Sequence, residues 1–397
     1  MIVGCVRFIV MIRLILLTDF TEAFARYLLR GILKYSKGKK ESWIVCRMPP
    51  SYKRRIGISG VVAWAKKWEA DAIIGQFDVK DDVSFFSKNG IIAFAQDYKK
   101  RFSNIPNITS DYHMAGRIAA DFFIEKGYKN FAFFGYKDAV WSLERKEGYL
   151  EGIRTHGLSE NFYEYNNNRI DNLWYYDSEP LITWLKTLPL STALFACDDN
   201  QAIKITEVCR TIDIKIPEEI AVLGVDNDTV VCNLSDPPIS SILMDVEMAG
   251  LDAAALIDQI LKDENTIPHD IFVKPIKIVN RISTDLYPTR DPYVLTAIKY
   301  IHKNIAEKIN VTEIVAQVPL SRRLLENRFR KETGQAIYQY ILKHKIERFS
   351  QLLLLSDSPI SEIATNVGFF DYKNVARKFK SIKKCSPSQY RAQNKVL

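Results

Sequence analysis

The sequence predicts an α/β region made of two doubly wound lobes, followed by an all-α domain. From residue 12 to about residue 285, short apolar runs alternate with helix-length amphipathic segments. This alternation stops at a polar stretch that contains Pro288 and Pro292, and no strand-like run follows it. Positive charge gathers in the same C-terminal part: 20 Lys and Arg stand against 9 Asp and Glu from Pro288 onward, but 35 against 38 before it.

The apolar runs are typical of strands that are buried on both faces. Between them lie helix-length segments such as "DYHMAGRIAADFFIEKGY", and strands that alternate with helices indicate parallel sheets. Because some 270 residues are many for one such sheet, we expect two lobes over 12–285. The runs are "RLILLTD", "SWIVCRM", "DAIIGQFD", "IIAFAQD", "NFAFFGY", "TALFACDD" and "IAVLGVDN".

The apolar start of the chain, "MIVGCVRFIVMIRLILLTDF", does not predict a membrane segment. Arg7 and Arg13 interrupt it, so no uncharged run approaches the length that a span needs. It also lacks a cleavage site of the signal-peptide kind. We expect Ile12–Thr18 to form the first strand, Met11 to be a plausible start and residues 1–10 to be dispensable, in a cytoplasmic protein without membrane contact.

The cysteines and histidines give no sign of a disulfide framework, a zinc site or another metal site. The six cysteines (Cys5, Cys46, Cys197, Cys209, Cys232, Cys385) contain no C-x-x-C pair, and the five histidines are scattered. This usage fits a reducing compartment, and we expect no cofactor.

Two helix pairs are predicted in the all-α domain at 293–394, which follows a linker at 286–292. In "ISEIATNVGFFDYKNVARKFKSIKKCSPSQYR", Gly368 suits the left-handed residue that ends the first helix. Apolar spacing then turns Val375, Phe379 and Ile382 inward, so that the basic residues face solvent. In "VTEIVAQVPLSRRLLENRFRKETG", Ser321 is expected to cap a second helix, and "AIYQYILKHKIERFSQLLLL" to form a long connecting helix.

Two basic helices on a rigid connector suit adjacent major-groove faces of duplex DNA, about 34 Å apart. Like charges on one small helix repel each other, and phosphates would relieve that repulsion. The other interpretation of a single helix pair is a solvated basic face.

The segment "ISEIATNVGFFDYKNVARKFKSIKKCSPSQYR" resembles the signature of the AraC/XylS-type DNA-binding domain, a double helix-turn-helix. It shares I-x-x-I-A, the G-F turn, the aromatic residue of "DY", F-K and the P-x-x-Y-R close. The resemblance implies that Arg328, Arg330, Lys378 and Lys380 contact phosphates. The expected DNA-binding residues are Arg322, Arg323, Glu326, Asn327 and Arg330 in the first unit, and Tyr372, Lys373, Asn374, Arg377 and Lys378 in the second.

In the α/β region, polar and aromatic residues follow the predicted strands, where doubly wound folds bind their ligands. Carboxylates, an amide and aromatic rings suit a neutral polyol. Asp111 and Asp199 have a simpler reading as helix N-caps. Paired carboxylates also serve enzymes, but no nucleophile elbow, phosphate loop or metal-spaced set accompanies them, so we expect no catalysis. The expected effector-binding residues are Asp19, Gln76, Phe77, Asp78, Trp141, Arg145, Asp198 and Asp226.

The same region resembles the periplasmic-binding-protein-like sensor of LacI/GalR-type sugar regulators. The shared segments include "WSLERKEGYLEGI", "ALFACDDNQA" and "IPEEIAVLGVDND". The resemblance implies that Arg145 and Asp226 contact the sugar, and that Asp198 stands where this family usually has Asn. Unlike that family, the chain begins directly at the first predicted strand, without a preceding helix-turn-helix.

A LacI-like sensor fused to an AraC-type reader is similar to the XylR-type regulators of xylose operons. The resemblance implies a homodimeric, DNA-binding transcriptional activator that works with RNA polymerase and responds to D-xylose or a related pentose. A repressor that responds to another sugar, and a sugar-binding or transport component, remain alternatives.

Overall fold

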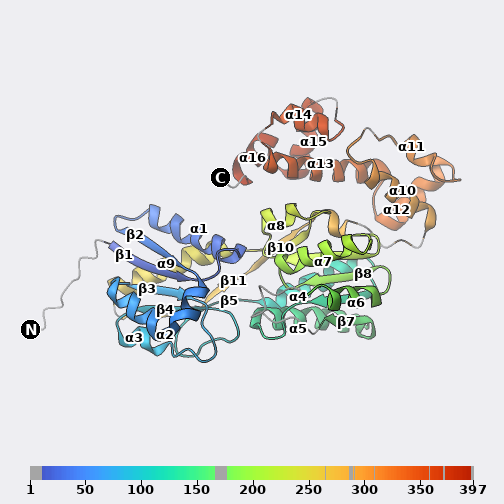
Figure 1. Cartoon of the computed structure of the whole chain (residues 1–397). Coiled ribbons are helices and arrows are strands. Elements are labelled where there is room, and N and C mark those ends of the chain that lie inside the picture. Colours follow the sequence, from blue (N-terminus) through green and yellow to red (C-terminus); the bar gives the residue numbers. More distant parts are fainter. Residues whose placement is uncertain are drawn as a thin grey trace, which may run out of the picture. The chain divides into compact units, whose positions relative to one another are not determined.

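The computed structural model describes residues 11–165, 177–263, 265–285, 289, 291–307, 309–356, 358–369 and 372–394, of which 351, 354, 355, 372, 373, 393 and 394 by backbone alone. The chain forms two compact units, Met1–Asp285 and Leu286–Leu397 (Figure 1). Residues 1–10, and 286–288 and 290 of the expected linker, lie outside the described part.

The first lobe of the first unit is built on a six-stranded sheet in which all strand pairs are parallel. The strand order reverses direction at β1, which places a topological switch point between β1 and β3. The order is β11 (Ile271–Val273), β5 (Asn107–Ser110), β4 (Ile92–Gln96), β3 (Ala72–Gly75), β1 (Met11–Leu17), β2 (Ser42–Met48).

The second lobe repeats this plan with a second six-stranded sheet. Its strands are parallel except β12, which pairs antiparallel with β10 at one edge. Its switch point lies between β6 and β8. The order is β12 (Pro275–Val279), β10 (Ser240–Met244), β9 (Ile220–Val225), β8 (Thr192–Ala196), β6 (Asn130–Phe134), β7 (Phe162–Tyr165).

Helices flank both sheets, and the central strands are buried on both faces. In β1, Leu14 and Leu16 belong to one apolar core, whereas Ile15 and Leu17 belong to another. The predicted α/β fold of two doubly wound lobes is therefore confirmed. The helices of this unit are α1 (Ala23–Lys37), α2 (Pro50–Lys67), α3 (Ser84–Lys88), α4 (Tyr112–Glu125), α5 (Val140–Thr155), α6 (Glu179–Thr187), α7 (Asp199–Thr211), α8 (Thr229–Leu234) and α9 (Val246–Lys262).

The chain passes between the lobes three times: between β5 and α4, between β10 and α9, and between β11 and β12. Helix α4, which follows the first of these passages, lies in close contact with α5. A Cβ on Gly116 of α4 would lie 2.1 Å from the carbonyl oxygen of Arg145 in α5, and one on Gly148 of α5 would lie 1.9 Å from that of His113. The backbones of α4 and α5 therefore touch, which they can do only because both positions are glycine.

The second unit is entirely helical in its described part, and its long helix α13 (Ile337–Leu355) joins two cores. Ile337 and Tyr340 pack in the first core, and Phe349 and Leu353 in the second. The first core also holds α10 (Pro292–Lys303), α11 (Val311–Val315) and α12 (Arg322–Thr333); the second holds α14 (Ile360–Asn366), α15 (Tyr372–Lys383) and α16 (Pro387–Asn394).

Local signals set the ends of these helices. Ser321 caps α12, and Gly368 takes a left-handed φ of 73° after α14, as the sequence predicts. Helix α10 begins at Pro292, inside the expected linker, because proline suits the first helical position and Asp291 caps the helix. Ile382 was expected to face inward, but it is 38% exposed.

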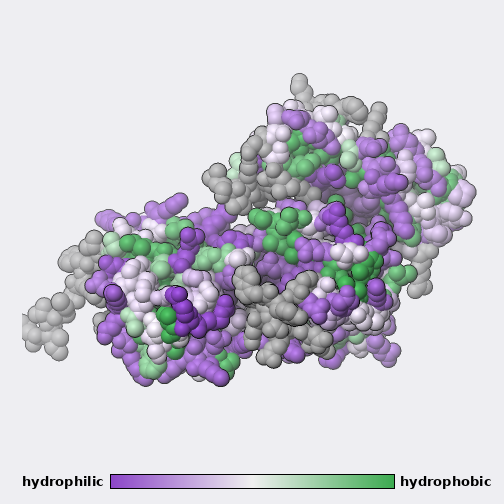
Figure 2. All heavy atoms as spheres, viewed as in Figure 1, coloured by the Kyte–Doolittle hydropathy of each residue, from purple (hydrophilic) through white to green (hydrophobic). Residues whose placement is uncertain are grey.

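The viewed surface is mostly hydrophilic, and its apolar residues form separate patches (Figure 2). Among the described helices, none is long and apolar enough to cross a bilayer.

Candidate functional site

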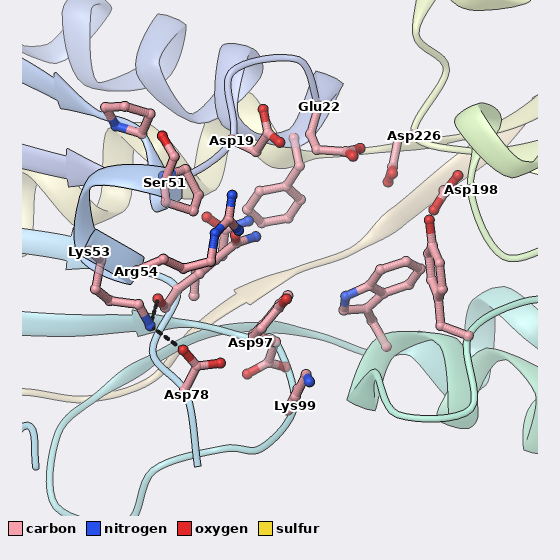
Figure 3. Close-up of a pocket in the computed structure, with 18 of the residues that line it drawn as sticks. Asp19, Glu22, Ser51, Lys53, Arg54, Asp78, Asp97, Lys99, Asp198 and Asp226 are labelled. Carbon is pink, nitrogen blue, oxygen red and sulfur yellow. Dashed lines mark hydrogen bonds and ion pairs between the residues drawn. The ribbon is translucent and has the colours of Figure 1, made fainter. Parts of the chain in front are cut away.

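A cavity of about 520 Å³ lies between the two lobes of the first unit, where strands of both sheets end. Figure 3 shows Asp19, Glu22, Ser51 and Asp78 with Asp198 and Asp226 around it. The lining residues are Asp19, Glu22, Phe24, Pro49, Pro50, Ser51, Lys53, Arg54, Gln76, Asp78, Gln96, Asp97, Tyr98, Lys99, Tyr112, Tyr136, Trp141, Arg145, Asp198 and Asp226.

Seven of the eight expected effector-binding residues line this cavity, and Phe77 does not. Phe77 is 0% exposed, and its ring packs against Phe86 at 5.5 Å and Phe102 at 6.0 Å. In the extended chain after β3, successive side chains point to opposite sides. Gln76 and Asp78 therefore point to the cavity, and the intervening Phe77 points to the core. The assignment of Phe77 to the effector was wrong.

Arg145 is held by several neighbours at the cavity. Its side chain is buried, and its guanidinium donates to the carbonyl oxygen of Cys197 and to Asp226 Oδ1, the latter at 3.4 Å. The guanidinium also lies over the rings of Tyr112 and Trp141, at 5.3 and 5.4 Å from their centroids. A cation held on several sides keeps its orientation when a ligand arrives, which favours binding.

Glu22 was missed by the sequence analysis. It immediately precedes α1, and Figure 3 shows it facing Asp226 and Asp198 across the cavity. Burial, followed by the charges of Asp198 and Asp226, raises the pKa of Glu22 to about 8, and burial raises that of Asp198 to about 6. The only available signal was its place three residues after Asp19, in the loop that follows the first strand.

This arrangement of carboxyl groups indicates a neutral ligand that is rich in hydroxyls. An anion would meet repulsion from the ionised carboxylates among them, whereas hydroxyl groups can donate to the oxygens of Glu22, Asp198 and Asp226. Within the described residues, no group of three or more His, Cys, Asp or Glu is arranged to hold a metal ion.

Two buried polar atoms of cavity residues have no hydrogen-bond partner among the described residues. In the part of the chain that the structure describes, Nε of Arg145 and Oδ1 of Asp97 have none. The other oxygen of Asp97 accepts from Thr109 at 2.6 Å and from Arg101 at 3.1 Å. Buried polar groups normally have hydrogen-bond partners, so these two atoms favour a polar ligand.

Asp78 lines the cavity, but Lys53 already holds its carboxylate. The buried ammonium of Lys53 lies 2.8 Å from Asp78 Oδ2 and 2.7 Å from Asp81 Oδ2, and it donates to the carbonyl oxygen of Gln76 at 3.2 Å (Figure 3). One oxygen of Asp78 is therefore already engaged, as one oxygen of Asp226 is by Arg145.

The aspartates that follow strands also shape helix starts, although differently from the expectation. Asp111 caps α4 by accepting from the Met114 amide at 2.8 Å. Asp198, rather than Asp199, caps α7 by accepting from the Gln201 amide at 2.7 Å. Asp199 is the first residue of that helix and does not have the alternative role of a cap; it accepts from the Asp228 amide at 2.7 Å instead.

Direct contacts also join the two lobes. Arg101 of the first lobe forms a two-pronged ion pair with Glu144 of α5, at 2.6 and 2.8 Å. Asn200 of the second lobe donates to Glu22 at 2.9 Å, and the Tyr27 hydroxyl donates to the carbonyl oxygen of Asn227 at 3.0 Å. These bonds depend on lobe separation, because their partners come from different lobes.

The second candidate site lies on the two basic helices of the helical unit. On α12, Leu325 and Phe329 are buried, whereas Arg322, Arg323, Asn327 and Arg330 are exposed. Glu326, expected to read bases, is half-buried and pairs with Arg322 at 3.1 Å. The face of α12 that turns away from its core is therefore polar and mainly cationic.

On α15, the same division holds. Val375 and Phe379 are buried, Arg377 is exposed and lies 3.4 Å from the half-buried Asn374. Lys378 bonds to the Tyr338 hydroxyl at the start of α13 and lies over that ring. The expected contacts of Tyr372 and Lys373 fall on side chains outside the described part.

Arg328, expected to contact a phosphate, has a structural partner. It pairs with Asp291 at 3.1 Å and lies over the Tyr293 ring at 5.7 Å. Asp291 caps α10, so Arg328 ties α12 to the start of that helix. Arg330 and Lys380 remain exposed on their helices.

Comparison with known proteins matches both units. Residues 120–284 match the family described as periplasmic binding protein-like domain, and residues 314–393 match a helix-turn-helix domain family. A solved structure, "structure of xylose-binding transcription activator xylR", is similar over 97% of this chain and 99% of that chain, with 25% identity and a TM-score of 0.68.

Relatives also match across both units. The xylose operon regulatory protein of Escherichia coli (strain K12) is 28% identical over 96% of this chain and 97% of its own length. The xylose operon regulatory protein of Haemophilus influenzae is 30% identical over 81% of this chain and 84% of its own length. These matches confirm the predicted resemblance and the sensor-plus-reader architecture. The chain belongs to the family of xylose operon regulatory proteins and is a sugar-sensing transcriptional regulator with a C-terminal helix-turn-helix domain.

Proposed function

We propose that the chain activates transcription of pentose-utilisation genes when D-xylose, or a closely related pentose, binds in the cavity of the first unit. The observation that carries the proposal is the buried Arg145, which contacts Asp226 within a wall of carboxyl groups from both lobes. The relatives are xylose operon regulatory proteins, and the similar solved structure is that of a xylose-binding transcription activator, which supports the same sugar.

The cavity wall offers each part of a pentose a suitable partner. Arg145 donates to ring or hydroxyl oxygens, and Asp226 accepts from two neighbouring hydroxyls. The Trp141 ring supplies an apolar face against the C–H side of the sugar. Glu22 and Asp19 meet the sugar from the first lobe, and Asp198 from the second. Gln76 and Asp78 complete the first-lobe side, although Lys53 already engages Asp78.

Sugar that contacts both lobes stabilises the closed arrangement over an open one. A ligand shifts such an equilibrium only by its difference in affinity for the two states. The interlobe bonds of Arg101 and of Glu22 join the two lobes directly, so they favour the closed state whether or not sugar is bound. The change then reaches the reader domain through the linker at 286–292.

The reader domain recognises a promoter site with α12 and α15. Arg323, Asn327 and Asn374 have the side chains that bind guanine and adenine edges, and Arg377 lies on the same helix as Asn374. Arg322, Arg330 and Lys378 meet phosphates, which set position without reading sequence. The full set is Arg322, Arg323, Glu326, Asn327, Arg330, Tyr372, Lys373, Asn374, Arg377 and Lys378.

The proposal also covers the oligomeric state, the cellular location and the protein partner of the chain. The chain acts as a homodimer in the cytoplasm, contacts RNA polymerase as an activator and performs no catalysis. The relatives are transcriptional regulators, and this supports a non-enzymatic role.

Calorimetry with a panel of D-xylose, L-arabinose, D-ribose and D-glucose tests the sugar site. We expect one pentose to bind the full-length chain, and Arg145→Ala to weaken it about 100-fold, because the change removes charge-assisted bonds and leaves Asp226 unpaired. Arg154→Ala, an exposed position on the same helix, is the matched control and should bind like the wild type. A variant at Arg145 that binds within threefold of the wild type would contradict the assignment.

Footprinting and in vitro transcription with and without the bound pentose test the direction of regulation. We expect the sugar to increase promoter occupancy and transcript yield. Release of the promoter upon sugar binding would instead make the protein a repressor, and would leave the sugar site intact.

A further inference from the structure

A buried lysine lies where the two halves of the helical unit meet. Lys345 is near the middle of α13, between the side chains that fill the first core and those that fill the second. It is only 5% exposed, although a lysine is almost never fully buried unless it is paired. Its partners therefore explain why the position tolerates a charge.

The ammonium of Lys345 donates hydrogen bonds to three backbone carbonyl groups, which come from both halves of the unit. It donates to Glu307, in the turn after α10, at 2.5 Å, and to Val367 and Gly368, just after α14, at 3.0 and 3.2 Å. The last carbonyls of a helix lack partners within the helix and carry its negative dipole end, so a cation satisfies them well. The described residues give this ammonium no carboxylate partner.

The two halves also approach each other closely at this place. A Cβ on Gly368 would lie 2.6 Å from the Glu307 carbonyl oxygen and 2.6 Å from the Lys345 ammonium. The Phe369 ring lies beside the ammonium, with 5.5 Å from Nζ to the ring centroid. These contacts form one junction between the two halves. We call it the Lys345 junction, and it consists of Glu307, Lys345, Val367, Gly368 and Phe369.

Stability alone does not account for this lysine. Burial lowers the pKa of Lys345 to about 8, so the folded state holds the charge at a cost. Replacing a buried charge with an apolar side chain of similar volume is often neutral or stabilising, whereas its directional bonds fix geometry. What the three bonds fix here is the orientation of α14 and α15 relative to α10 and α12.

We propose that Lys345 is a positioning residue that sets the spacing between the two DNA segments read by α12 and α15. A continuous α13 of 19 residues is about 28 Å long, near the 34 Å of one duplex turn. The helix fixes distance along its axis, and the Lys345 junction fixes rotation and tilt about that axis. Both are needed for two helices to enter adjacent groove faces together. The inference rests on DNA reading by α12 and α15.

Spacing preference is the property to measure. The full-length chain first selects its site from random duplex DNA, and affinities are then compared between that site and versions in which two base pairs are added or removed between the two segments. We expect the wild type to prefer the selected spacing at least tenfold, and Lys345→Met to prefer it less than threefold. Lys345→Arg, which keeps donors and charge, should recover part of the preference.

The matched control is Lys299→Met, which removes the same charge from an exposed position on α10. It should keep the wild-type ratio, because lost charge weakens all duplexes alike. A ratio of two affinities from one preparation does not depend on the folded fraction, so partial unfolding does not imitate the effect.

A second route to the junction keeps the test valid if Lys345→Met does not fold. Gly368→Ala should also lower the spacing preference, because its Cβ would displace Glu307 and Lys345. Gly334→Ala is its control: Gly334 has a φ of 74°, like the 73° of Gly368, but its Cβ would meet nothing within 4 Å. Wild-type ratios in the folded variants at Lys345 or Gly368 overturn the inference. A wild type that selects no duplex at all would instead overturn DNA reading itself.

Discussion

The cavity and the basic helices hold their functional side chains in opposite ways. Arg145 is buried, and its position is set by Cys197, Asp226 and two aromatic rings. Arg323 is exposed on α12, whose other face packs in a core, and no hydrogen bond to another described residue holds its side chain. A sugar site therefore depends on mutual contacts among its residues, whereas a DNA-reading helix depends on the packing behind it.

The largest effect should come from removing that packing. Phe329 is 0% exposed and packs edge-on against Tyr340 at 5.3 Å, so Phe329→Ala should destabilise the helical unit by about 3–5 kcal/mol. We expect DNA binding to be lost while calorimetric pentose binding by the same preparation persists. Leu324→Ala, 42% exposed on the same helix, is the control. Loss of sugar binding as well would show that the two units do not fold independently.

A smaller effect on DNA affinity should distinguish the exposed residues that read bases from those that contact phosphates. Arg323→Ala should cost about 1–3 kcal/mol at one base pair and relax specificity there. Lys380→Ala should weaken all duplexes alike and reduce the slope of log affinity against log salt by about one. Binding assays on single-base variants over a salt series measure both. Interchanged outcomes would mean that the reading face of α12 is wrongly assigned.

The smallest effect is a dependence on pH confined to the sensor. The pKa of Glu22 is raised to about 8 from an ordinary value of 4.5, so the folded state holds this proton more tightly than the unfolded state does. The resulting stability is fully present below pH 4.5 and is lost as the pH rises through 8. Asp198, with its pKa raised to about 6, acts in the same direction.

Tryptophan fluorescence isolates this unit, because all six tryptophans precede residue 286. We expect the melting temperature to fall by a few degrees between pH 5 and pH 8, and Glu22→Gln to reduce that fall. Glu160→Gln, at an exposed position, should behave like the wild type. An unchanged pH dependence in Glu22→Gln would mean that its carboxyl group is not the one that titrates.

The helical unit was the more predictable of the two from sequence. Its signals are local: Ser321 as a cap, Gly368 as a left-handed turn, and apolar residues at helical spacing. The error at Ile382 arose at the end of α15, where the last turn extends beyond the core.

In the first unit, seven of the twelve described strands were predicted, and β5, β7, β10, β11 and β12 were missed. The seven apolar runs correspond to β1–β4, β6, β8 and β9, whereas β5 reads "NITS" and β10 reads "SSILM". Their polar side chains are buried because distant segments satisfy them: Asn107 donates to Asp270 at 3.1 Å, and Ser240 bonds to the backbone of Arg281. Such pairings do not appear in a local pattern.

The same reason separates the predicted and the missed residues of the cavity. Strand ends identified Asp19, Arg145 was identified through its family motif, and both line the cavity. The side on which Phe77 falls depends on how the chain leaves β3. The importance of Glu22 depends on which residues face it from the other lobe, and only the folded unit brings them together.

The glycine contact between α4 and α5 extends the sugar site beyond its own wall. A Cβ at Gly116 would clash with the backbone carbonyl of Arg145. Any larger residue at position 116 would therefore displace the backbone of Arg145, and its guanidinium with it, without contacting a ligand. Laboratory evolution toward another inducer would therefore gain from randomising this helix crossing as well as the wall. Substitutions at the crossing of α4 and α5 would change the sugar preference by moving Arg145, although Arg145 itself is not substituted.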